Sequence, residues 1–143
     1  MKCFLLLFRT FFAVCGILVF CVAGPRMAGD DVLPNGAQSV GMLTMPRGAS
    51  ARQVQQAIVT SLTKRSWIVK SVDDSTVVGY LKHRGYEATL TFRYDENHIE
   101  IISDSYEIDS DGKRLERKNP TRWIDYLKQD IPHYLAVEMQ PAK

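Results

Sequence analysis

Cysteine is scarce in this chain, and its three copies, Cys3, Cys15 and Cys21, all lie near the N-terminus. The residues after position 23 contain none, so disulfides, thiol nucleophiles and cysteine-ligated zinc are excluded from that part of the protein. A domain of about 100 residues can bury enough apolar surface to be stable without disulfides. The scarcity of cysteine therefore excludes certain kinds of chemistry, but it is compatible with export of the protein.

The motifs of common enzyme chemistry are absent as well. The chain has no G-x-S-x-G elbow, no P-loop and no dinucleotide-binding fingerprint. Its histidines, His83, His98 and His133, are dispersed, and no pair has the spacing of a zinc-binding helix. An acidic run at 107–111 precedes a glycine as in a calcium loop, but Lys118 stands where the main carboxylate ligand belongs. We therefore predict a protein that is not an enzyme and has no metal or other cofactor.

Excess charge of either sign is also lacking. The chain has 18 basic and 16 acidic residues, which gives a formal net charge of +2. Two of the basic residues, Lys2 and Arg9, lie in the N-terminal segment, so the remainder has 16 basic against 16 acidic residues. A neutral domain lacks the basic footprint of a nucleic-acid-binding protein, and we expect no nucleic acid as partner.

The N-terminal residues 1–23 have the pattern of a secretory signal peptide. Lys2 and Arg9 form the positive front, and the apolar run 10–22 has the length of a signal core. Small residues precede the cleavage point, which is predicted after Ala23. Two alternatives stay open: an uncleaved membrane anchor, which needs about 20 residues to span, and lipid attachment at a cysteine. Each alternative predicts an exported protein that touches the membrane only through this segment.

Residues 24–49 are rich in glycine and proline, a composition that predicts a flexible linker. Within this linker, residues 40–45 are apolar enough to lie on the following domain as a short extended segment. Residues 50–139 are expected to form that domain, which is of the α+β class.

Two helices are predicted at the ends of the domain. The first begins at Ser50, which has capping-box spacing with Gln53. The second covers residues 119–135, where Asn119 is the expected cap and apolar side chains recur every three or four residues. Pro132 lacks a backbone donor, so a kink or break is expected near residues 129–131.

Four strands are expected between the two helices, at residues 67–72, 76–83, 86–94 and 98–104. The third alternates strictly between apolar and polar side chains, which is typical of an antiparallel strand with one buried face. The connections are too short for crossover helices, so the strands should form an antiparallel meander. The predicted fold is a two-layer α-β-β-β-β-α domain in which both helices cover one face of a four-stranded sheet.

Two surfaces are candidate interaction sites. The open sheet face, turned away from the helices, is expected to present Val78, Tyr80, Thr89, Thr91 and Ile102. A basic run, predicted to be a loop, presents Lys113, Arg114, Arg117 and Lys118. Such a loop could touch anionic lipid head groups or acidic glycans. The simpler interpretations are scattered exposed apolar residues and a solvated loop.

Several short motifs follow one another between residues 104 and 131. They are Asp104-Ser105, Asp111-Gly112, the basic stretch 113–118, Asn119 with Arg122-Trp123, and Leu127 with Asp130-Ile131. Together with upstream features such as Trp67, they resemble a family of small, largely uncharacterised bacterial envelope proteins, many of which are named lipoproteins. The resemblance covers roughly residues 50–135, and it implies a location rather than an activity.

These observations favour a non-enzymatic bacterial cell-envelope protein, periplasmic or membrane-anchored facing the periplasm, that acts as a binding module. Its expected partner is an envelope protein or another envelope component. A small secreted enzyme acting on envelope polymers is one alternative, and it predicts a concave pocket with clustered titratable residues. A small-ligand-binding module is the other, and it needs a cavity beneath Trp67 and Trp123.

Overall fold

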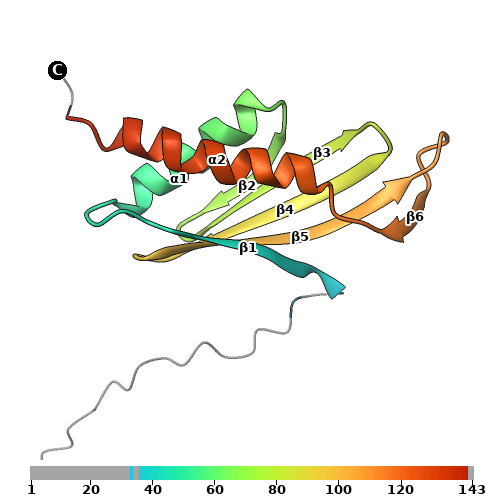
Figure 1. Cartoon of the computed structure of the whole chain (residues 1–143), viewed down its shortest axis with the longest axis horizontal. Coiled ribbons are helices and arrows are strands. Elements are labelled where there is room, and N and C mark those ends of the chain that lie inside the picture. Colours follow the sequence, from blue (N-terminus) through green and yellow to red (C-terminus); the bar gives the residue numbers. More distant parts are fainter. Residues whose placement is uncertain (1–32, 34–35, 142–143) are drawn as a thin grey trace, which may run out of the picture. The chain divides into compact units, whose positions relative to one another are not determined.

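Two helices pack against one face of an antiparallel sheet in the described part of the chain (Figure 1). The computed structural model describes residue 33 and residues 36–141. The predicted signal peptide and the first part of the predicted linker lie outside this range. Among the described residues, no helix is both long and apolar enough to cross a membrane.

The sheet has six strands, and every pair of neighbouring strands is antiparallel. The strands are β1 (Gln38–Thr44), β2 (Ile68–Asp73), β3 (Thr76–His83), β4 (Tyr86–Tyr94), β5 (His98–Ile108) and β6 (Arg114–Arg117). They lie in the order β1-β5-β4-β3-β2, and β6 also pairs with β5. The α+β class is confirmed, and β2 to β5 form the expected meander.

Two strands were not expected, and both pair with the outer edge of β5. That strand is 11 residues long, so its edge accommodates β1 at one end and β6 at the other. The segment that becomes β1 was predicted to be part of a flexible linker, although with an extended stretch on the domain. The segment that becomes β6 was predicted to be a loop, because a short, wholly exposed and mostly charged strand has no alternation to reveal it.

The first helix, α1 (Ala51–Lys64), begins as its sequence predicts. Gln53 N donates to Ser50 Oγ at 3.3 Å, and Ser50 N donates to Gln53 Oε1 at 2.9 Å. The capping box is therefore formed in both directions.

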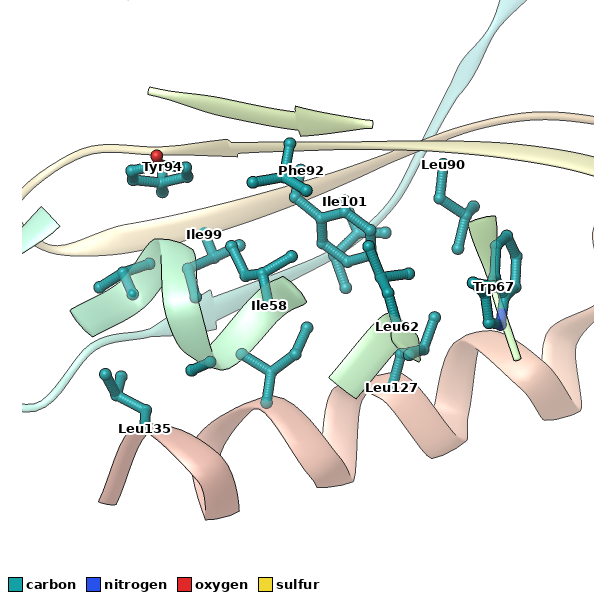
Figure 2. Packing of buried hydrophobic residues seen from close by; sticks show 14 of the residues in the cluster. Ile58, Leu62, Trp67, Leu90, Phe92, Tyr94, Ile99, Ile101, Leu127 and Leu135 are labelled. Carbon is teal, nitrogen blue, oxygen red and sulfur yellow. The ribbon is translucent and has the colours of Figure 1, made fainter. Parts of the chain in front are cut away.

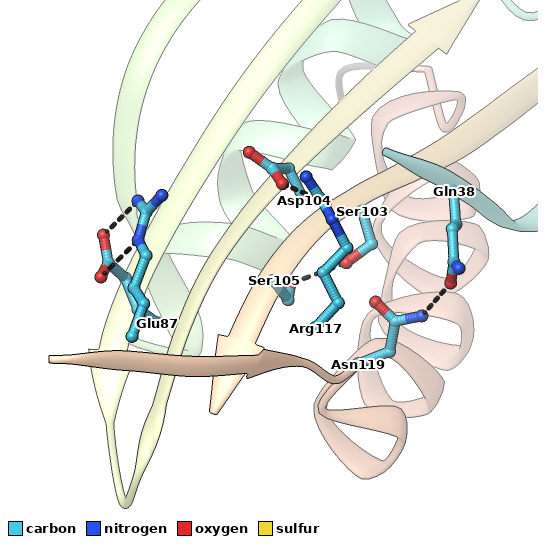
Figure 3. Close-up of polar contacts among 8 residues, drawn as sticks. Gln38, Glu87, Ser103, Asp104, Ser105, Arg117 and Asn119 are labelled. Carbon is cyan, nitrogen blue, oxygen red and sulfur yellow. Dashed lines mark hydrogen bonds and ion pairs between the residues drawn. The ribbon is translucent and has the colours of Figure 1, made fainter. Parts of the chain in front are cut away.

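The second helix, α2 (Thr121–Glu138), departs from its prediction at two points. Its N-cap residue is Pro120, and no side chain caps it. Asn119 instead donates from Nδ2 to Gln38 Oε1 at 3.0 Å, which joins the start of α2 to β1 (Figure 3). The helix also continues through Pro132 without the predicted break. Ile131 directly precedes the proline, Leu135 follows it by three residues, and both are buried in the core. Their burial offsets the backbone hydrogen bond that Pro132 cannot donate.

The core lies between the helices and the sheet face that carries Leu90, Phe92 and Ile101 (Figure 2). Leu62 of α1 and Leu127 of α2 are fully buried against it. Gly79 on β3 permits the close approach of α1, because a Cβ at this position would lie 2.8 Å from Leu62 Cδ2.

Candidate interaction surface and pockets

The register of the sheet brings the predicted open-face residues together. Tyr80 pairs with Thr89, Val78 pairs with Thr91, and Thr91 pairs in turn with Ile102. Directly paired residues project from the same face, and these project away from the helices. Four of the five are half-buried, but Ile102 is only 4% exposed. Its expected exposure is wrong because β1, which was not predicted as a strand, pairs beside it through Ser39.

Two further apolar side chains widen this face, and sequence reasoning missed both. Met42 on β1 pairs with Glu100, and Ile68 on β2 pairs with Tyr80. They are 63% and 56% exposed, among the most exposed large apolar side chains in the described part of the chain. The apolar stretch 40–45 could have indicated Met42. Once this stretch is recognised as a strand, its alternation assigns Met42 to one face of the sheet. We define the open face as Met42, Ile68, Val78, Tyr80, Thr89 and Thr91.

Three of the four residues of the predicted basic surface, Arg114, Arg117 and Lys118, are paired with carboxylates. Arg114 Nη2 lies 2.8 Å from Glu87 Oε1, and its Nε donates to the other oxygen of the same carboxylate at 3.1 Å. These hydrogen bonds lower the pKa of Glu87. Lys118 Nζ pairs with Glu107 at 3.0 Å, which raises the pKa of this lysine. Lys113 is exposed.

Tyr106 is the centre of this charged region. The Cζ atoms of Arg114 and Arg117 lie 4.4 and 4.7 Å from the centroid of its ring. Arg117 also pairs with Asp104 (Figure 3). We call Glu87, Asp104, Tyr106, Arg114 and Arg117 the Tyr106 cluster. Its two guanidinium groups are already matched by two carboxylates, so an anionic ligand would have to compete with existing ion pairs.

The acidic run 107–111 contains the last two residues of β5 and the start of the turn to β6. Asp109 Oδ1 accepts hydrogen bonds from the backbone amides of Asp111 at 3.0 Å and Lys113 at 2.8 Å. Gly112 adopts a φ of +81°, a conformation that favours glycine. Within residues 36–141, no group of three or more His, Cys, Asp and Glu side chains is placed to hold a metal ion.

A cleft lies at the Trp67 and Trp123 end of the helix layer, where the ligand-binding alternative requires one. Its volume is about 200 Å³, and it is lined by Arg65, Trp67, Leu81, His83, Trp123 and Tyr126. The two indole rings meet edge to face with their centroids 6.3 Å apart. Arg65 is held by Asp130, with Nε–Oδ2 at 2.6 Å and Nη2–Oδ1 at 3.1 Å. It therefore ties the end of α1 to α2 rather than offering a free cation.

A larger pocket lies at the opposite end of α2. Its volume is about 410 Å³, and it is lined by Leu43, Thr44, Met45, Pro46, Ile99, Ile131, Pro132, Leu135 and Ala136. We call it the apolar groove. Neither this groove nor the cleft at the tryptophans has a carboxylate in its lining, so neither has the paired acids of a glycoside hydrolase.

Comparisons with known proteins do not assign this chain to a family. A scan against protein-family models and a search of curated proteins found no match. The resemblance to bacterial envelope proteins therefore stays a prediction. The fold defines the chain only as an α+β protein with a six-stranded antiparallel sheet covered by two helices.

Proposed function

We propose that the protein is a non-enzymatic binding module of the bacterial cell envelope and that its open face holds a partner protein with an apolar surface. One observation carries this proposal: Ile68, Val78 and Tyr80 are neighbours on a sheet face that neither described helix covers. Exposed apolar patches of this kind mark interaction sites more often than chance. The signal-like residues 1–23 support the envelope location.

The composition of the open face and its surroundings is that of a protein interface. Met42, Ile68, Val78 and Tyr80 supply apolar and aromatic area, and Tyr80 has a raised pKa mainly because burial disfavours its charged form. The Tyr106 cluster follows along β4 and β5 and supplies a charge-balanced rim. An apolar centre with a polar rim is the usual anatomy of such sites.

The outer edges of the sheet are less suited to a partner than its face. The register of β2 shifts between Val69 and Ser71, so Lys70 is an extra residue at this edge. The register of β1 shifts similarly around Val40, whose carbonyl accepts a hydrogen bond from Lys128 Nζ at 2.7 Å. Bulges and edge lysines are devices that prevent strand addition. A partner is therefore expected to bind across the face.

Site-specific photo-crosslinking in living cells tests the proposal. Tyr80 and Tyr126 are replaced, one at a time, by benzoylphenylalanine in the full-length chain. Tyr80 lies on the open face, whereas Tyr126 lies on α2 in the helix layer and is 37% exposed, so the second variant is a matched aromatic control. The expected result is a discrete adduct from position 80 and none from position 126, with the partner identified by mass spectrometry as an envelope protein.

The identified pair is then purified, and its dissociation constant is measured with Val78→Lys in the open face. A buried interfacial lysine should weaken binding by roughly tenfold to a hundredfold. The proposal is refuted if position 80 gives no adduct, if position 126 gives the same adducts, or if Val78→Lys leaves the affinity unchanged.

A further inference from the structure

The apolar groove is an open channel between the end of β1 and the last turns of α2. Residues 43–46 form one wall, and Pro132 and Ala136 form the other. Its floor consists of Ile99, Ile131 and Leu135, all buried in the core. The volume of about 410 Å³ falls within the range of small-molecule sites, roughly 300–1,000 Å³. The groove is thus large enough for a ligand and rests on a rigid base.

The lining of the groove selects for hydrocarbon. Eight of its nine residues are Leu, Ile, Met, Pro or Ala, and the ninth is Thr44. There is no aromatic ring for stacking a planar ligand and no charged group for binding a polar one. Pro132 also lacks a backbone N–H, so the helix wall offers no amide donor at that position. The ligand that this lining favours is therefore an aliphatic one.

The rim of the groove is accessible, and a basic residue follows one of its lining residues in the chain. Thr44, Pro46, Pro132 and Ala136 are exposed, so a chain can enter from solvent. Arg47 directly follows the lining residue Pro46, is exposed, and forms no ion pair with another described residue. A guanidinium pairs well with a carboxylate or phosphate, so Arg47 is the cation that we assign to the anionic end of such a chain.

From these features we infer that the apolar groove binds a linear acyl chain that ends in an anionic group. This site is separate from the open face and lies in a different layer of the domain. We assign the groove to a free fatty acid, whose single acyl chain suits a volume of about 410 Å³. A membrane phospholipid, which carries the same chemistry, is the other outcome of the experiment below.

Photolabelling of the full-length chain locates the bound acyl chain directly. The protein is incubated with palmitic acid that carries a diazirine in mid-chain and, in a second arm, with phosphatidylglycerol vesicles whose lipid carries the same acyl group. Adducts are mapped by peptide mass spectrometry. The expected adducts fall in residues 43–46 and 131–136. Labelling in the first arm alone identifies a free fatty acid as the ligand, and labelling in the second identifies a membrane lipid.

Variants of the groove show whether the labelling depends on the site. Ala136→Phe places a ring at the exposed rim and should reduce adducts in both segments by roughly tenfold. Thr44→Phe does the same from the opposite wall. Val137→Phe is the matched control, because Val137 is adjacent, 51% exposed and not part of the lining. It should leave labelling unchanged, and circular dichroism verifies that all three variants fold.

Two outcomes overturn the inference. The first is labelling confined to residues 1–23 or to other segments outside the groove, in either arm. The second is labelling of the two walls that persists in folded Ala136→Phe and Thr44→Phe proteins at the level of the control.

Discussion

Leu127 lies in the middle of α2 and is completely buried, so its truncation measures how firmly this helix is held. Leu127→Ala removes most of the side chain from a site that contributes to the main core cluster. Truncation of a fully buried leucine costs about 3–5 kcal/mol through lost burial and the remaining cavity. A domain of this size is stable by roughly 5–15 kcal/mol. The variant is therefore expected to fold with a large part of its stability lost.

Urea denaturation followed by circular dichroism measures this loss. A change of about 3 kcal/mol, divided by a slope of about 2 kcal/mol per molar of urea, lowers the midpoint by about 1.5 M at unchanged slope. Leu115→Ala is the matched control, because Leu115 is 58% exposed on β6. Its change should stay below about 0.5 kcal/mol. Equal midpoints for the two variants would refute the packing of α2 against the sheet.

Three further predictions use different features of the fold. Pro132→Ala, at an exposed position, restores a backbone donor inside α2. It should raise the free energy of unfolding, measured in urea, by about 2 kcal/mol. A free energy of unfolding below that of the wild type would contradict this prediction. Gly79→Ala places a methyl group 2.8 Å from Leu62 Cδ2 and should lower the melting temperature, at a cost of about 1–3 kcal/mol. Arg114→Gln removes the hydrogen bonds that depress the pKa of Glu87. A carboxylate whose pKa is lower in the folded chain than in the unfolded chain stabilises the fold at pH values above its unfolded pKa. This stabilisation is lost as the pH falls through its folded pKa. The stability difference between the wild type and this variant should therefore be full at neutral pH and be lost as pH falls through the lowered folded pKa of Glu87, and a difference independent of pH would contradict it.

Local sequence patterns predicted the elements whose hydrogen bonds are local or whose alternation is strict. Ser50 and Gln53 are three residues apart and cap α1 in the way their spacing indicates. The alternation from Tyr86 to Tyr94 identified β4 with its correct bounds and its correct buried face. Short connections then restricted β2 to β5 to a meander. The α+β class follows from these features without knowledge of any distant contact.

The candidate site was predictable only in part. Alternation placed Val78, Tyr80, Thr89 and Thr91 on one face, which the register supports. It could not indicate that Ile102 is buried beside β1. It also could not indicate that Arg114 lies against Glu87, because these residues are 27 positions apart in the chain.

The sequence by itself therefore determined the capping box of α1, the strand alternation and the order of the central strands, because each is encoded within a few neighbouring residues. The tertiary structure alone decided that β1 and β6 share the edge of β5, that Arg114, Arg117 and Lys118 are paired with carboxylates, and that an apolar groove opens beside α2. Several of these features depend on contacts between segments far apart in the chain, such as Ser39 with Ile102 and Arg114 with Glu87. Such contacts form only when the whole sheet and both helices have been brought together.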